Sequence, residues 1–434
     1  MANLQRNHSL FIINACALAT TAIYLSFLLP RHGGIGLSEF LVAELLLALL
    51  WWGAYRAANH YQSAALVFFW ALVFRLIGVW GEPIFEDDYY RYLWDGYRFI
   101  TDGTPYSVAP GAFFDAQLPE KFAGIVGQIN HPDLPTIYGP TLQYLFALAY
   151  LISPGELWGL KLLMLGLDLA LIALLFRLAP PHHVLLYAWC PLVIKEIAFT
   201  AHPDGIGVFL LLLALFLRSR NQLTLAVVAA ALAVAAKVFA WLLIPWVLWR
   251  LSVRYWLLFF AVFTLIYLPF LVQGGSDLFS LAVFARDWQF NAALYAVLAL
   301  LMPDEMARIL LGSVFLGGWG WYFLHYQMRI KTGLPRGDIV FALFLFVSPV
   351  INAWYWLWVL PFAVIYPSRW AWVASSALLL SYCVGLHLPG ASLATYEIPL
   401  AVRLAEFVLV ATALAFDLRH RRKIVRARSG ELLE

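Results

Sequence analysis

The chain has 434 residues, of which 63% are hydrophobic and only 12% are charged, and its formal net charge is +3. A soluble domain carries about 25% charged and about 45–50% apolar residues, so this composition excludes a soluble enzyme. A chain this apolar dissolves in a bilayer, where each spanning helix needs about 20 apolar residues. We therefore expect an all-α polytopic membrane protein with about 11–14 transmembrane helices, organised as one integral membrane domain over residues 1–434.

Apolar segments follow one another along most of the chain. The first begins shortly after Arg6 and is followed by no small-residue cleavage site, so it is interpreted as an uncleaved span. Segment 141–153 has only thirteen residues and is interpreted as a partial span. The segments are 9–30, 38–55, 62–81, 141–153, 156–179, 183–201, 204–217, 221–249, 255–272, 290–302, 307–326, 338–366, 370–388 and 397–417.

Two of these segments, 221–249 and 338–366, are too long for one ordinary span. The first is interrupted by Lys237 and the second around Pro349–Trp354, so we expect each to be a hairpin of two shorter helices. The tips of the two hairpins are then Lys237 and the stretch from Asn352 to Tyr355.

Basic residues predict the orientation of the chain. The tail at 418–434 is strongly basic and directly follows the last apolar segment, so the positive-inside rule places the C-terminus in the cytoplasm. The basic clusters between spans favour a topology with both termini cytoplasmic and both hairpin tips outside. This topology needs an even number of crossings between 140 and 202, where three apolar segments lie, so one of them, 141–153, is interpreted as the partial span. These clusters are Arg218/Arg220, Arg250/Arg254 and Arg329/Lys331/Arg336.

In this topology residues 82–140 form a large first outer loop. The loop contains nine of the 25 acidic residues of the chain. Within it, acids before residue 89 and the sequence Gly103-Thr104-Pro105 are start and stop signals for a helix from about Asp88 to Thr101. Asp88, Arg91, Tyr92 and Asp95 share one face of this helix, and Tyr90, Leu93, Trp94 and Tyr97 occupy the neighbouring face. We expect a juxtamembrane helix that lies on the outer membrane surface with its aromatic face toward the lipid.

The polar face of this helix has two interpretations. Asp88 at the membrane edge can act as a general base toward a sugar hydroxyl, while an arginine fork matches phosphate oxygens. The alternative is a solvated amphipathic helix whose Asp and Arg side chains only stabilise one another.

Four motifs together resemble those of bacterial polytopic glycosyltransferases of the GT-C superfamily, in particular the polyprenyl-phosphate-mannose-dependent mannosyltransferases. The resemblance extends from about residue 82 to 366. It implies a sugar donor linked to a polyprenyl phosphate, an acidic residue on the first outer loop and an inverting single displacement. The motifs are EDDYYRYLWDGYRFITDGTPY from Glu86, PTIYGPTLQYLFAL at 135–148, YAWCPLVIKEIAFTAHPD at 187–204 and SPVINAWYWLWVLP at 348–361.

The resemblance assigns roles to individual positions. Asp88 matches the catalytic loop aspartate of the family, with Asp87 as the fallback. Tyr138-Gly139-Pro140 matches a Tyr-Pro-Pro turn, and Gly139 in place of proline predicts a looser turn. His202 and Asp204 match a His-x-Asp signature and are expected to contact donor phosphate or acceptor hydroxyls. The alternative is that Asp204 caps a helix and His202 is a polar loop residue.

Further charged residues in apolar surroundings are candidates for the same site. Lys195 and Glu196 stand in an apolar segment, so they are expected to pair or to line a cavity. Lys237 is the only charge between Gln222 and Arg250. An unpaired ammonium there needs an anion, which the lipid phosphate would supply; the alternative is a lysine that snorkels to the interface.

Two aromatic patches complete the predicted site. Arg91 and Arg286 are candidates for phosphate or pyranose binding, with Trp288 stacking on a sugar ring; the alternative is an interfacial aromatic anchor. Asn352 and Tyr355 at the second hairpin tip are candidate sugar contacts. His131 and Asp133 of the first loop are weaker candidates for acceptor contacts.

We expect no obligatory metal, because the acids at 87–88 and His202 with Asp204 lack a compact ligand spacing, although a divalent cation could bind them. The predicted partners are a sugar donor linked to a polyprenyl phosphate, a lipid, glycan or protein acceptor, and membrane lipids, without nucleic acid. The resemblance implies that the sugar is mannose. The predicted function is glycosyl transfer on the outer face of the bacterial inner membrane. A secondary transporter or lipid flippase stays open as the alternative, because interrupted helices with buried charges suit it.

Overall fold

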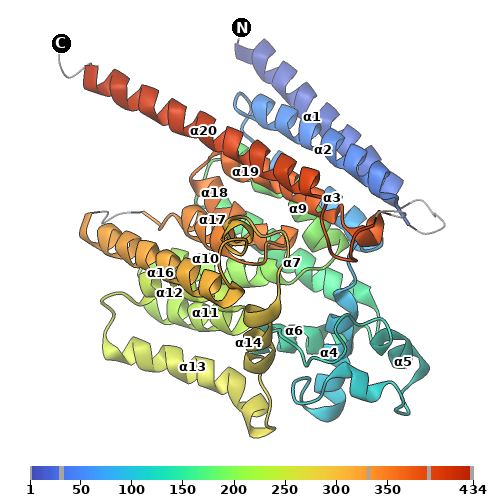
Figure 1. Cartoon of the computed structure of the whole chain (residues 1–434). Helices are drawn as coiled ribbons and strands as arrows, with labels where there is room; N and C mark the ends of the chain where they lie inside the picture. Colours follow the sequence, from blue (N-terminus) through green and yellow to red (C-terminus); the bar gives the residue numbers. More distant parts are fainter. Residues whose placement is uncertain (1, 29–33, 330–332, 389–391, 431–434) are drawn as a thin grey trace.

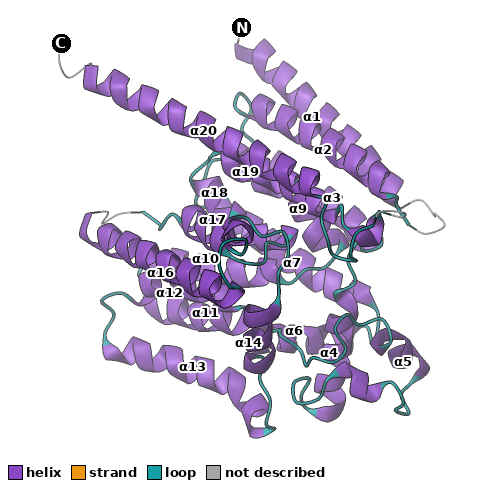
Figure 2. Ribbon diagram, in the orientation of Figure 1, coloured by secondary structure: helices purple, strands orange, loops and turns teal. Residues whose placement is uncertain are grey.

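The computed structural model describes residues 2–28, 34–329, 333–388 and 392–430. Lys331 of the predicted basic clusters and residues 431–434 of the predicted tail lie outside these ranges. Regular secondary structure in the described ranges is helical throughout, as Figure 2 shows, apart from one isolated bridge between Phe290 and Val350. The predicted all-α polytopic fold is confirmed.

The N-terminal helices α1 (Ala2–Phe27) and α2 (Leu37–Ala58) pack side by side, and α3 (Ala64–Trp80) follows (Figure 1). The Ser63 side chain caps α3 by accepting a hydrogen bond from the Leu66 amide. Arg75 of α3 forms a buried ion pair with Asp168, 2.5 Å away, which joins α3 to α7 (Leu157–Leu175). This ion pair attaches α3 to α7 in the interior of the molecule.

The loop after α3 carries α4 (Tyr89–Asp102), which confirms the helix predicted from about Asp88 to Thr101. The 3-10 turn η1 (Pro110–Phe113) and α5 (Glu120–Val126) follow in the same loop. α4 packs on α6 (Pro140–Ile152) through Gly96, where a Cβ atom would lie 2.4 Å from the Phe146 carbonyl oxygen. The aromatic face of α4 is covered by α5, and Trp94 is buried among Phe122 and Ile125. The prediction that this face lies on lipid is therefore wrong, because a second helix of the same loop covers it.

The central helices are strongly interrupted. After α8 (Pro181–Ala188) and α9 (Pro191–Val193), the π-helical turn η2 (Ile194–Phe199) is bent by 112° against α10 (Asp204–Ser219). α11 (Leu223–Ala236) ends at Lys237 and is followed by η3 (Val238–Leu243) and α12 (Ile244–Leu248), so the predicted break at Lys237 is confirmed. The bend and the break both face the loop before α4, and they position the charged side chains described below.

Interrupted helices also occur in the C-terminal half. The predicted interruption of segment 338–366 is confirmed, since α17 ends at Val347 and η4 begins at Ala353. α20 forms a long helix along one side of the molecule (Figure 1) and extends the last apolar segment into the basic tail. The elements are α13 (Val253–Val272), α14 (Leu278–Asp287), α15 (Leu294–Leu298), α16 (Asp304–Arg329), α17 (Gly337–Val347), η4 (Ala353–Trp358), α18 (Leu360–Ile365), α19 (Arg369–Ala377), η5 (Leu378–Tyr382), η6 (Gly385–His387) and α20 (Leu400–Gly430).

Among the described residues, four helices are long and apolar enough to cross a membrane, and five if η2 and α10 with their bend count as one span. Five further apolar helices have 10–17 residues, which includes α6 over the predicted partial span. The short lengths follow from proline, glycine and charged residues that interrupt the apolar segments. Non-helical backbone at such depth is tolerated where protein surrounds it or where it lines a cavity.

Candidate active site

The site begins at the acidic turn between α3 and α4. Asp87 and Asp88 immediately precede α4, and the backbone before them is strained at Phe85, with φ of 56°. A left-handed conformation is unfavourable for a bulky residue and persists only where the surroundings impose it. The turn aims the Asp88 carboxylate away from α4, toward two residues that are distant in sequence.

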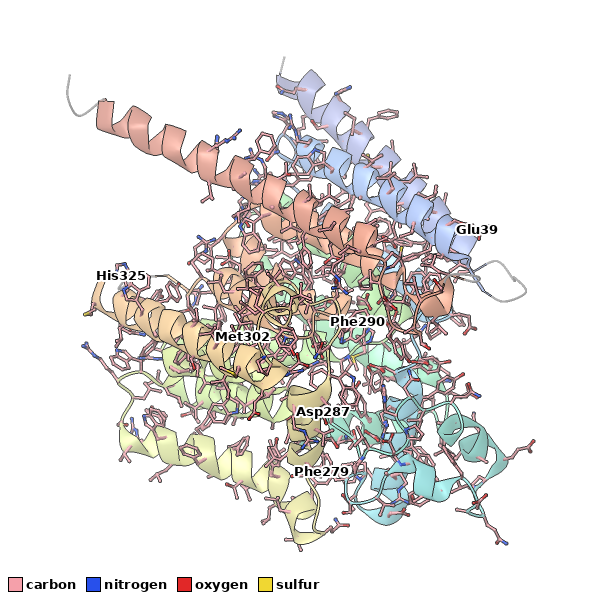
Figure 3. The ribbon with its side chains drawn as sticks, in the orientation of Figure 1. Glu39, Phe279, Asp287, Phe290, Met302 and His325 are labelled. Atoms are coloured by element: carbon pink, nitrogen blue, oxygen red, sulfur yellow. The ribbon has the colours of Figure 1, made fainter. Side chains whose placement is uncertain are left out.

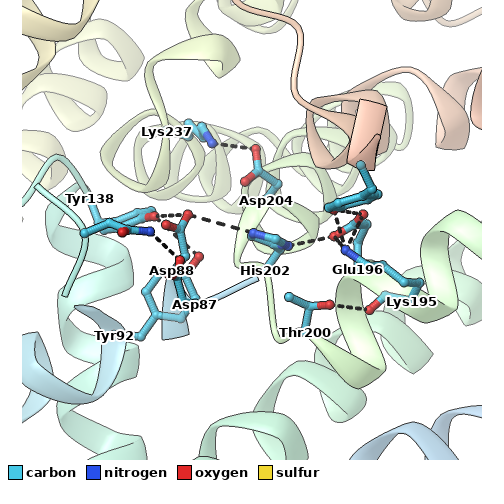
Figure 4. A network of polar contacts seen from close by, with 12 residues as sticks. Asp87, Asp88, Tyr92, Tyr138, Lys195, Glu196, Thr200, His202, Asp204 and Lys237 are labelled. Atoms are coloured by element: carbon cyan, nitrogen blue, oxygen red, sulfur yellow. Dashed lines mark hydrogen bonds and ion pairs between the residues drawn. The ribbon is translucent and has the colours of Figure 1, made fainter. Parts of the chain in front are cut away.

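Those two residues are Tyr138 and His202 (Figure 4). The Tyr138 hydroxyl donates a hydrogen bond to Asp88 Oδ2 at 3.1 Å, and His202 Nε2 lies 3.9 Å from the same oxygen. The Asp88 side chain is 31% exposed, whereas that of His202 is 1% exposed. Asp88 is therefore reachable by a ligand on one side and held by protein on the other.

His202 occupies the bend between η2 and α10. The preceding Ala201 has φ of 61°, a second strained position next to the site. His202 Nδ1 is 2.8 Å from Glu196 Oε2, and the imidazole stacks on Trp354 with ring centroids 4.2 Å apart. Within the described part of the chain, His202 Nε2 has no hydrogen-bond partner. A buried polar atom without a partner costs free energy, so this nitrogen is a candidate ligand contact.

Lys237 and Asp204 form the second pair of the site. Lys237 Nζ is 2.6 Å from Asp204 Oδ1, which also accepts a hydrogen bond of 2.9 Å from the Trp358 indole. The expectation that Lys237 lacks a protein counter-ion is wrong, because the bend before α10 brings the Asp204 carboxylate to the α11 break. Asp204 does not act as a side-chain cap of α10. Its Oδ2 atom has no hydrogen-bond partner among the described residues.

Tyr355 and Asn352 lie at the same place in the fold. The Lys237 ammonium is 4.6 Å from the centroid of the Tyr355 ring, and Asn352 stands at the start of η4, which carries Tyr355 and Trp358. The structure thus brings the second hairpin tip against the first.

Asp87 faces a different partner from Asp88. Its carboxylate accepts a hydrogen bond from the Asn130 amide group. Burial, and next the negative charge of Asp88, raise the pKa of Asp87 to about 6. Asp87 therefore binds a proton more readily than an ordinary aspartate, but its contact with Asn130 turns it toward the loop.

The Arg91 guanidinium lies on the loop side of α4. It donates hydrogen bonds to the carbonyl oxygens of Leu134, Asn130 and His131 at distances of 2.9–3.0 Å. These contacts fold residues 130–134 over α4. Arg91 thus stabilises the conformation of residues 130–134, and its guanidinium is directed to these carbonyl oxygens and not toward a phosphate beside Asp88.

The 286–291 patch is only partly connected to the site. Arg286 is 75% exposed and pairs with Asp287. Asp287 is the last residue of α14, and Phe290 lies in the segment that follows (Figure 3). Trp288 packs on His131, 4.8 Å between ring centroids, and the Phe290 backbone pairs with residues 349–351. Asp133 and His131 are exposed in the segment that Arg91 holds. These positions border the loop rather than the Asp88–His202 pair.

The Tyr138 turn is tighter than Gly139 suggested. A Cβ atom at Gly139 would lie 2.3 Å from the Ala235 carbonyl oxygen of α11. The turn is therefore packed directly on the helix that ends at Lys237, so the predicted looser turn is wrong. Close backbone approach, and not flexibility, requires glycine here.

Sequence reasoning missed several contacts of the site. Asn130 holds Asp87, Trp354 stacks on His202, and Trp358 holds Asp204. Lys195 and Glu196 were expected to pair, and they do, with 3.2 Å between Nζ and Oε1. Tyr382, which donates to Glu196 at 2.8 Å, carries no sequence signal, since it lies in an apolar segment far along the chain.

The residues present do not gather as a metal site. Within the ranges that the structure describes, no group of three or more His, Cys, Asp or Glu side chains could hold a metal ion. That the reaction needs no obligatory metal stays a prediction.

A family model described as alpha-(1->6)-mannopyranosyltransferase, N-terminal domain, matches residues 17–253. That range is more than half of the chain and includes Asp87, Asp88, Tyr138, His202, Asp204 and Lys237. The chain belongs to this family. It is accordingly a glycosyltransferase of the mannosyltransferase type, and it fits the GT-C resemblance of its motifs. No curated protein and no solved structure matches the chain in the other two comparisons.

The site of this mannosyltransferase takes residues both from the matched range and from the part of the chain that follows it. Residues beyond 253 lie outside the matched range, yet they supply Trp354, Tyr355 and Trp358 to the same side-chain network. The C-terminal part therefore adds aromatic side chains to a site whose charged residues belong to the matched part.

Proposed function

We propose that this mannosyltransferase moves mannose from a polyprenyl-phosphate donor to an acceptor hydroxyl in a single inverting displacement, with Asp88 as general base. The observation that carries the proposal is the position of Asp88. One partly exposed carboxylate lies beside a buried imidazole, close to a lysine at a helix break (Figure 4). A base and a cation placed together are what displacement of a phosphate by a hydroxyl requires.

On the acceptor side, Asp88 takes the proton of the attacking hydroxyl. Its Oδ2 atom is already oriented by Tyr138, and a hydroxyl between Oδ2 and His202 Nε2 could contact both atoms, which are 3.9 Å apart. The acceptor oxygen then attacks the anomeric carbon of the sugar. Asp87 is the fallback for this role, but its hydrogen bond to Asn130 competes.

On the donor side, Lys237 stabilises the departing phosphate. Its ammonium has three hydrogens, of which Asp204 engages one, and the side chain is 17% exposed. The bond between the anomeric carbon and the phosphate oxygen breaks, and its electron pair leaves with the lipid phosphate. The rings of Tyr355 and Trp354 flank these groups and offer apolar faces to a pyranose.

The family description, with its alpha-(1->6) bond, supports a primary 6-hydroxyl of a sugar as the acceptor. A single displacement inverts the anomeric carbon, so an alpha product requires a donor whose mannose is beta-linked to the phosphate. The acceptor of this proposal is a mannose-bearing glycan, lipid-linked or free. We further propose that the site faces the outside of the inner membrane with both termini in the cytoplasm, since the basic residues favour that orientation.

Transfer by purified protein in liposomes tests the proposal. Radiolabelled mannose on beta-linked polyprenyl phosphate is supplied with an alpha-mannoside acceptor, and nucleotide-activated mannose serves as the control donor. We expect an alpha-linked product from the lipid donor only, at a rate that a metal chelator leaves unchanged. Uptake of the labelled lipid without a product would instead support the transporter or flippase alternative.

A further inference from the structure

A buried charged cluster lies behind His202, on the side away from Asp88. Lys195 and Glu196 of η2 are 1% and 0% exposed, and Tyr382 of η5 donates a hydrogen bond of 2.8 Å to Glu196 Oε1. Burying an ion pair is costly unless hydrogen bonds satisfy its remaining atoms. Here Lys195 Nζ contacts both carboxylate oxygens, at 3.2 and 3.3 Å, Tyr382 donates to Oε1, and Oε2 lies 2.8 Å from His202 Nδ1. The cluster thus presents one carboxylate oxygen to the imidazole.

The contact with Glu196 determines which nitrogen of His202 carries the hydrogen. An ionised carboxylate is only an acceptor, so Nδ1, 2.8 Å from Glu196 Oε2, is the donor nitrogen. In the neutral ring Nε2 is then without a hydrogen. Stacking on Trp354 keeps the ring plane fixed, and Nε2 points to Asp88 Oδ2 at 3.9 Å. Nε2 also lacks a hydrogen-bond partner among the described residues, so it is free for a proton.

We propose that Glu196 is a positioning residue that acts through His202, holding the Nδ1–H tautomer so that Nε2 can receive the proton from Asp88. This inference rests on the proposed function. The O–H bond of the acceptor breaks as its oxygen bonds to the anomeric carbon, and the proton passes to Asp88 Oδ2 and then to Nε2. The phosphate leaves with the electron pair of its bond to the sugar. The resulting imidazolium lies between the carboxylates of Glu196 and Asp88, which stabilise it.

Substitution Glu196→Gln changes the tautomer without changing the shape. Oε1 accepts from both Lys195 and Tyr382, whereas Oε2 accepts only from Lys195, at 3.3 Å, and faces Nδ1. The amide oxygen therefore takes the Oε1 position, and the amide nitrogen faces Nδ1 with the loss of that one Lys195 contact. Nδ1 must then accept, and the hydrogen moves to Nε2, where it faces Asp88. An imidazole with a hydrogen on Nε2 cannot receive the proton at that atom. Its Nε2–H instead faces Asp88, the carboxylate that acts as the base, as a hydrogen-bond donor.

The test combines nitrogen NMR of histidine with kinetics on the full-length protein in lipid nanodiscs. The His202 signals are assigned by their loss in His202→Gln. We expect a protonated Nδ1 in the unmodified protein, a protonated Nε2 in E196Q, and a kcat that is lower by about 10²-fold in E196Q with an unchanged KM for the donor. The shorter carboxylate of E196D keeps the tautomer and recovers part of the rate, which also controls for folding.

Glu44 of α2 provides the matched control. It is also a buried glutamate, 5% exposed, but neither carboxylate oxygen has a hydrogen-bond partner in the described ranges. E44Q should retain both the tautomer and kcat. A protonated Nε2 in the unmodified protein, or unchanged kcat in E196Q, would overturn the inference. The spectrum gives this answer even if no mannose is transferred, so failure of the proposed function is recognised separately.

Discussion

The Lys237–Asp204 pair can be tested by removing its charges one at a time and together. Nζ and Oδ1 are 2.6 Å apart, and the two side chains are 17% and 1% exposed. At an effective dielectric constant of about 20, two unit charges at this distance attract by roughly 6 kcal/mol, much of which desolvation offsets. Lys237→Met leaves Asp204 buried with only the Trp358 indole as a partner. We expect this variant to lose about 3 kcal/mol of stability, as for other broken buried pairs.

The double variant removes both charges. Lys237→Met with Asp204→Asn leaves no uncompensated carboxylate, so it should be more stable than Lys237→Met alone, with a coupling energy of about 2–3 kcal/mol. Reversible unfolding in detergent, followed by tryptophan fluorescence for all four proteins, measures this coupling. The same variants should bind the lipid-phosphate donor more weakly, because both lack the ammonium. Additive effects on stability, with no coupling, would refute the argument that Asp204 is the counter-ion of Lys237.

Three further predictions concern residues around the site. Burial raises the pKa of Asp95 to about 6, so protonation of this carboxyl group favours the folded state at low pH, and that contribution to stability is lost as the pH rises from about 4 to 6. Asp95→Asn keeps an acceptor for Thr136 and Gln143 but does not titrate, so it should flatten the pH dependence of thermal unfolding between about pH 4 and 6. An unchanged profile would contradict this. Gly139→Ala should lower the unfolding temperature because of the Ala235 carbonyl, whereas Gly124→Ala, with open space around it, should not. Arg91→Met should make residues 130–134 more sensitive to protease and leave the donor KM unchanged; a raised KM would instead support phosphate binding by Arg91.

The sequence predicts the fold class, the helix from about Asp88 to Thr101 and the helix breaks at Lys237 and around Pro349. These features can be predicted because composition and interruptions of apolar segments are local properties of the chain. It also predicts Asp88, His202 and Asp204 as site residues through their motif. The contacts among them are not local. Asp204 meets Lys237 only because η2 and α10 are bent by 112°, an angle that no spacing of residues encodes.

Two predictions failed for the same reason. The aromatic face of α4 was expected to need lipid, and Lys237 was expected to need a ligand anion, since each lacks a partner in its own segment. In the structure α5 covers Trp94 and Asp204 neutralises Lys237. A periodic pattern shows that a side chain needs a partner, but it does not distinguish protein from lipid or substrate.

Substitution of Asp88 tests the central claim most directly. Asp88→Asn keeps an acceptor oxygen for Tyr138 but cannot take a proton, and Asp115→Asn, in an exposed part of the same loop, is the matched control. In single-turnover reactions with saturating lipid-linked mannose, we predict that D88N binds the donor normally and transfers mannose at least about 10²-fold more slowly, while D115N retains the full rate. Full-rate transfer by D88N would contradict the assignment of Asp88 as the base.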